Sequence, residues 1–103
     1  MDDHQRRVLR DMADEVHQFR EGRLPVDHLA RNLRGLMLAA DFKSSKLRDD
    51  FDALWSRIDA EAELRTEPWA PPGLASDDAL SDGLDALLSW VRDRISDEDT
   101  DRA

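Results

Sequence analysis

Residues 77–96 read DDALSDGLDALLSWVRDRIS, and this stretch decides the fold because it separates two faces of one helix. At 100° per residue, its large aliphatic residues fall between about 280° and 20° around the helix axis, measured from Asp77, and four aspartates fall between about 80° and 160°. The apolar arc, the leucine stripe, consists of Leu80, Leu84, Leu87, Leu88, Val91 and Ile95. The acidic arc, the aspartate ridge, consists of Asp78, Asp82, Asp85 and Asp93.

Three earlier segments show the same helical periodicity, over about residues 3–21, 25–40 and 44–65. Gly22 fits a left-handed cap at the end of the first helix. Pro25 suits the first turn of the second helix, because its missing N–H would have no partner there.

Gly35 lies inside the second helical segment, where glycine costs roughly 1 kcal/mol relative to alanine. Close approach of another helix explains such a cost better than flexibility does. The sequence therefore predicts that Gly35 lies at a helix–helix contact.

Residues 66–73 read TEPWAPPG, and three prolines with a glycine predict a break before the last helix. Ser76 or Asp77 is then expected to cap that helix. Trp69, flanked by prolines, either extends towards a partner or folds back to close the end of the bundle, and we favour closure. Trp55 is expected in the core.

These patterns predict an all-α fold, a small four-helix bundle with a proline-rich loop before the last helix. A chain of 103 residues fits a single domain, which we place at residues 1–96. Residues 97–103 are expected to form a disordered acidic tail, since their only apolar residue is the final alanine.

Composition narrows the functional classes. The chain has no cysteine, which excludes disulfides, thiolate metal sites and cysteine nucleophiles. No run approaches the roughly 20 apolar residues that span a bilayer. The net charge of −9 disfavours binding to nucleic acids or to anionic membranes. We expect a soluble, cytoplasmic protein.

The sequence offers little for catalysis. Asp14 and His17 have the spacing of a carboxylate and an imidazole on one helix face, but a di-iron bundle site needs two such units and two further carboxylates. His4, His17 and His28 are therefore expected at the surface. No Gly-x-Ser-x-Gly turn or phosphate-binding loop occurs. We expect no cofactor, no metal and no enzymatic activity.

Negative charge is concentrated at one end of the chain. From Thr66 to Ala103, ten acidic residues outnumber three basic ones, which gives −7 of the total −9. A one-sided acidic surface favours a basic partner. Trp90, at about 220° on the last helix, either acts as an interface hot spot or packs against a neighbouring helix or the Trp69 loop. The predicted partner-binding residues are Asp78, Asp82, Asp85, Trp90 and Asp93.

The chain also reads Phe19-x-x-Gly22-x-Leu24-Pro25, then leucines at 29, 33 and 36, then Phe51-x-x-x-Trp55. Over about residues 16–62, this hydrophobic spacing resembles the small helical immunity proteins of bacterial contact-dependent inhibition and related polymorphic toxin systems. After Trp55 the chain departs from the family pattern, which has a glutamate and then an aromatic residue. The resemblance implies a protein that occludes a basic, nuclease-type toxin domain.

Two other hypotheses remain open. The chain could be a self-associating scaffold or regulatory subunit, a homodimer in which Trp69 and Trp90 bury one another. It could instead be a small metalloprotein that uses His17.

Overall fold

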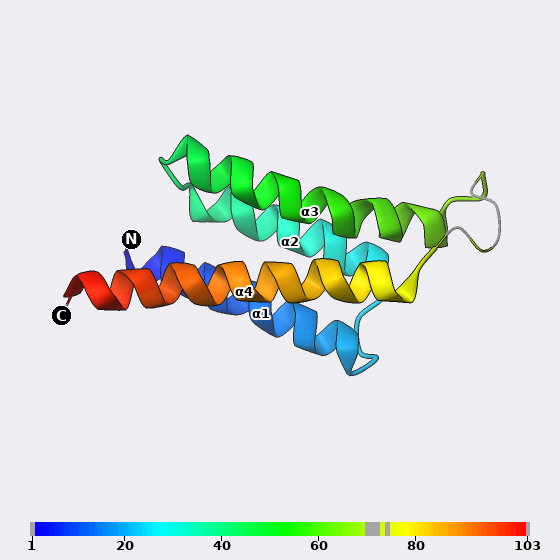
Figure 1. Ribbon diagram of the computed structural model, residues 1–103, viewed down its shortest axis with the longest axis horizontal. Helices are drawn as coiled ribbons and strands as arrows, with labels where there is room; N and C mark the ends of the chain where they lie inside the picture. Colours follow the sequence, from blue (N-terminus) through cyan, green and yellow to red (C-terminus); the bar gives the residue numbers. More distant parts are fainter. Residues whose placement is uncertain (1, 70–72, 74, 103) are drawn as a thin grey trace.

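Four helices form an antiparallel bundle in the computed structural model, which describes residues 2–69, 73 and 75–102, with side chains only up to Ser96 in the last helix (Figure 1). They are α1 (Asp3–Arg20), α2 (Val26–Ala40), α3 (Ser45–Thr66) and α4 (Asp77–Arg102). The helices are arranged in a ring, in which α1 packs against α2 and α4, and α3 packs against the same two helices. Within the part of the chain that is described, no helix has the length and apolar character needed to cross a membrane.

The two ends of α1 are closed by local hydrogen bonds. The Asp2 carboxylate accepts from the Gln5 backbone N–H at 2.8 Å, and the Gln5 side chain accepts from the Asp2 N–H at 3.3 Å, which is a capping box. At the other end Gly22 has φ +79°, and the Arg23 N–H donates to the Gln18 carbonyl at 2.9 Å. The predicted left-handed cap at Gly22 is therefore confirmed.

The remaining helix boundaries lie close to the predicted ones. Pro25 stands just before α2, as its N-cap, rather than in its first turn. Asp41 ends α2 with φ 52°, a left-handed conformation that was not predicted from the sequence. Ser44 caps α3 by accepting from the Leu47 N–H at 3.3 Å, and Ser76 caps α4 by accepting from the Ala79 N–H at 3.1 Å.

All four helices contribute to one hydrophobic core, as the apolar stripes predicted. Within the leucine stripe, Leu80, Leu84, Leu87 and Val91 are buried, whereas Leu88 and Ile95 are half-buried. The largest fully buried side chains are Phe51, Leu9, Met12, Leu29, Leu33, Ile58, Leu84, Leu87 and Val16. Burial of the stripe fixes the rotation of α4 about its own axis.

The prediction for Gly35 is wrong. Gly35 is exposed, and a methyl group added to it would meet nothing within 4 Å. The close approach occurs at Gly83 instead, where an added Cβ would lie 3.6 Å from Ile58 Cγ1 and 3.8 Å from Arg57 Cβ. Helical periodicity alone did not distinguish the two glycines, because each lies inside an amphipathic helix.

The C-terminal end also differs from the prediction. Helix α4 continues to Arg102, whereas the sequence predicts a domain that ends at Ser96 and a disordered tail at 97–103. No proline or glycine follows Ser96, so nothing in the backbone stops the helix there. Ala103, and residues 70–72 and 74 of the proline-rich link, lie outside the described residues.

Two alanine substitutions are expected to change stability in opposite directions. Gly35→Ala should stabilise the protein by about 1 kcal/mol, because the site is helical and open. Gly22→Ala should destabilise it by about 1 kcal/mol, because the Cβ of alanine is sterically strained at the positive φ of this position. Urea denaturation measures both, and a destabilised Gly35→Ala variant would restore the packing interpretation of Gly35.

Candidate partner-binding surfaces

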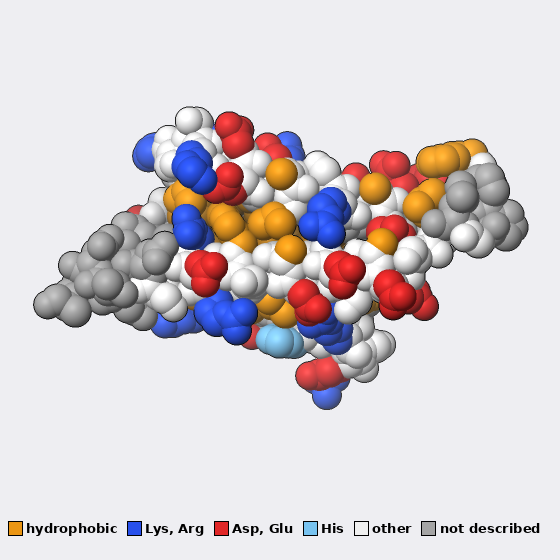
Figure 2. Space-filling model, in the orientation of Figure 1, with side chains coloured by type: hydrophobic (Ala, Val, Ile, Leu, Met, Phe, Trp, Pro, Cys, Tyr) orange, Lys and Arg blue, Asp and Glu red, His pale blue; other side chains and the backbone are white. Residues whose placement is uncertain are grey.

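The aspartate ridge lies on the solvent side of α4, and all four of its side chains are exposed. Asp85 is already neutralised, since its Oδ1 lies 2.7 Å from Arg20 Nη2 on α1. Asp78, Asp82 and Asp93 have no ion-pair or hydrogen-bond partner among the described side chains. The ridge therefore presents three unpaired carboxylates rather than four. Figure 2 shows acidic side chains spaced along α4, with basic side chains below them towards α1.

Trp90 packs inside the bundle. Its ring lies 6.2 Å from that of Phe51 on α3, at an interplanar angle of 51°, and the residue is half-buried. Its indole Nε1 is buried and has no hydrogen-bond partner among the described residues. Of the two interpretations of Trp90, packing against a neighbouring helix is the one observed. Only the exposed part of the residue is available to a partner.

Trp69 does not close the end of the bundle, so the favoured interpretation was wrong. The residue is 64% exposed and follows the end of α3. An ion network connects α3 to the start of α4 instead, with Arg65 Nη1 lying 2.8 Å from Glu61 Oε2 and Arg65 Nη2 lying 2.9 Å from Asp77 Oδ1. Glu61 Oε2 also accepts from the Ser76 N–H at 3.1 Å.

The Arg65 guanidinium is the centre of this junction. Burial alone would lower its pKa, but hydrogen bonds to Asp77 and Glu61, together with their negative charges, outweigh burial and raise the pKa. Arg65 therefore stays charged and holds the first turn of α4 against α3. The Glu61–Arg65 spacing of four residues was visible in the sequence, whereas the contact with Asp77 depends on the tertiary fold.

A second acidic surface was missed at the sequence level. A groove of about 530 Å³ between α2 and α3 is lined by four carboxylates, Asp27, Asp59, Glu63 and Glu67, and by two arginines, Arg31 and Arg34. Trp55 forms part of its wall, with its Nε1–H donating to the Ala30 carbonyl at 2.7 Å. The spacing of Trp55, Asp59, Glu63 and Glu67, every fourth residue, was the available signal, because it places them on one helix face.

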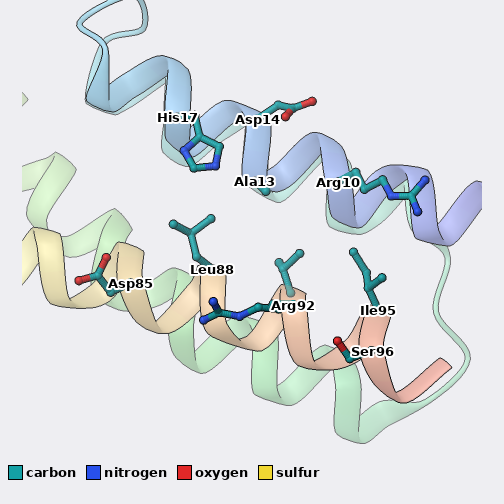
Figure 3. Close-up of a pocket in the computed structure, with 10 residues that line it drawn as sticks. Arg10, Ala13, Asp14, His17, Asp85, Leu88, Arg92, Ile95 and Ser96 are labelled. Carbon is teal, nitrogen blue, oxygen red and sulfur yellow. The ribbon is translucent and has the colours of Figure 1, made fainter. Parts of the chain in front are cut away.

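A second hollow, of about 720 Å³, lies between α1 and α4. Asp14 and His17 line it, but Figure 3 shows His17 pointing towards α4 and Asp14 pointing away from it. His4, His17 and His28 are all exposed. Within the described part of the chain, no three histidine, aspartate or glutamate side chains are grouped closely enough to hold a metal ion.

The bundle thus offers three surfaces: the aspartate ridge, the acidic α2–α3 groove, and the α1–α4 groove with its apolar floor. Comparison of the chain with models of protein families, with curated proteins and with solved structures finds no match. Function is therefore inferred from the chemistry of these surfaces.

Replacement of Trp90 tests its packing role. Trp90→Ala should destabilise the protein by about 3 kcal/mol, because it removes a half-buried ring from the core. Trp90→Phe should cost under about 1 kcal/mol, since it keeps a ring against Phe51 and removes the unpaired N–H. Chemical denaturation gives both values. Equal stability of wild type and Trp90→Ala would show that the ring does not pack in solution.

Replacement of Arg65 tests the junction. Arg65→Met should destabilise the protein by about 1–2 kcal/mol, because it leaves the partly buried Glu61 carboxylate without its cation. The matched control is Arg23→Met, which removes an exposed arginine whose one ion-pair partner among the described side chains is Glu21, and it should change stability by under about 0.5 kcal/mol. Similar losses in both variants would contradict a special role for Arg65.

Proposed function

We propose that this chain is a non-enzymatic, cytoplasmic protein-binding module that neutralises a basic protein partner through the outer face of α4. The observation that carries the proposal is the set of three exposed carboxylates on the aspartate ridge, Asp78, Asp82 and Asp93, that have no partner among the described side chains. Unpaired surface charges of one sign attract an oppositely charged partner and raise its association rate by about 10–10³-fold.

The ridge has the fixed geometry that recognition needs. Asp82 and Asp93 lie three helical turns apart, or roughly 16 Å along α4. Burial of Leu84, Leu87 and Val91 on the opposite side holds this spacing rigid, so little conformational entropy is lost on binding. Asp85 contributes less than expected from the sequence, because Arg20 already neutralises it.

The most concrete form of this proposal is an immunity protein that blocks a nuclease-type toxin domain. The resemblance in hydrophobic spacing motivates it, and the all-helical bundle is compatible with it. A nuclease domain carries basic residues where it binds nucleic acid phosphates, so an acidic ridge would compete for the same residues. Such a protein needs no cofactor and performs no reaction.

Self-association remains the alternative, now with Trp69 as its main support. Trp69 is 64% exposed, whereas Trp90 already packs against Phe51. Among the described residues, the other exposed large apolar side chain is Leu38, near the far end of α2, so the two do not form one patch (Figure 1). Mutual burial of Trp69 and Trp90 therefore has less support than ridge binding.

Charge reversal tests the ridge. The triple variant Asp78→Lys, Asp82→Lys, Asp93→Lys, used as bait on source-cell lysate, should lose the basic protein that the wild type retains. Helicity and thermal stability should change little, because all three positions are exposed and unpaired. Asp85 is left intact so that its ion pair with Arg20 persists.

The matched control reverses three carboxylates of the α2–α3 groove, Asp59, Glu63 and Glu67, which gives the same change in net charge. The control should still retain the partner. Loss of the partner by both variants would show that binding depends only on the net charge of the chain. Retention of the partner by the ridge variant would show that the ridge is not the contact surface.

A further inference from the structure

The groove between α1 and α4 is a hollow in the bundle with an apolar floor. Ala13 of α1 and Leu88, Val91 and Ile95 of α4 form that floor, and the hollow measures about 720 Å³. Figure 3 shows Leu88 and Ile95 pointing from α4 towards α1. Small-molecule sites of about 300–1,000 Å³ with mostly apolar walls are typical of proteins, and this groove falls in that range.

The hollow exists because α1 presents small or polar side chains where α4 presents large apolar ones. The large apolar residues of α1, such as Leu9, Met12 and Val16, point into the central core. That orientation leaves Ala13 opposite the outer edge of the leucine stripe. Leu88 and Ile95 consequently remain half-buried, with apolar surface still in contact with water.

The rim of the groove carries cations from both helices. Arg10 on α1 and Arg92 on α4 line the groove, where Figure 3 shows their side chains extending in opposite directions, and neither pairs with a carboxylate among the described side chains. Of the two acidic residues at the rim, Asp85 is neutralised by Arg20, and Asp14 points away from the groove in Figure 3. On a chain whose net charge is −9, the rim therefore offers a ligand two arginines, Arg10 and Arg92, that have no ion-pair partner among the described side chains.

We propose that this groove binds a free amphipathic carboxylate of the fatty-acid type. Its aliphatic chain covers Leu88, Val91 and Ile95, which removes their remaining apolar surface from water. Its carboxylate lies between Arg10 and Arg92, two exposed side chains that can rotate towards it at little cost. The inference is independent of the basic-partner proposal, which depends on Asp78, Asp82 and Asp93; none of these three lines the groove, and Asp85 borders both surfaces.

The experiment titrates the full chain with decanoate at concentrations below those at which it forms micelles, and follows backbone amide shifts by NMR. We expect saturable one-to-one binding, with the largest shifts around Ala13, Leu88 and Ile95. Arg92→Gln and Arg10→Gln should each weaken binding about tenfold, because each removes a charged hydrogen bond to the carboxylate. Arg31→Gln on α2 is the matched control and should bind as the wild type does.

Two further arms exclude other occupants. Decyltrimethylammonium has the same chain with a positive headgroup and should bind at least tenfold more weakly than decanoate. Ala13→Leu fills the floor and should abolish decanoate binding while leaving the helical content unchanged.

Non-saturable binding, equal affinity for the two amphiphiles, or unchanged affinity in Arg92→Gln would each overturn the proposal. Light scattering on the same samples addresses a second copy as occupant. A wild-type dimer that Ala13→Leu converts to a monomer would assign the groove to self-association and overturn it as well.

Discussion

Burial of the leucine stripe is the constraint on which the rest of the structure depends. Leu84, Leu87 and Val91 are almost completely removed from water between α1 and α3. Each such side chain contributes roughly 1.5–3 kcal/mol to folding, far more than any exposed ion pair. The stripe therefore sets the rotation of α4, and that rotation leaves the aspartate ridge on the solvent side.

Ion pairs between neighbouring helices then fix the start of α4 and decide which of its surface carboxylates stay unpaired. Arg65 connects the end of α3 to the first turn of α4 through Glu61 and Asp77. Arg20 neutralises Asp85 from the neighbouring helix, so the acidic face narrows to three carboxylates. The acidic surface available to another molecule is therefore a defined set of three carboxylates, because only charges without a nearby partner can pair with that molecule.

Much of the fold could be predicted from the sequence, because apolar spacing and capping residues act locally. The helices, the caps at Gly22 and Ser76, and the exposed ridge all follow from such patterns. The features that were mispredicted or missed depend on which helices are neighbours. Helical periodicity could not show which glycine, Gly35 or Gly83, faces a neighbouring helix. The Arg20–Asp85 ion pair joins residues 65 positions apart in the sequence. The exposure of Trp69 depends on which residues close the end of the bundle.

Thiol labelling tests the central claim most directly, since the chain has no cysteine of its own. Single variants Asp82→Cys and Asp93→Cys would be reacted with a thiol reagent, with Leu84→Cys as the buried comparison, before and after addition of the captured basic partner. The account predicts fast reaction at positions 82 and 93, slow reaction at 84, and protection of 82 and 93 by the partner. Slow reaction at 82 and 93 without a partner, or undiminished reaction in the complex, would contradict it.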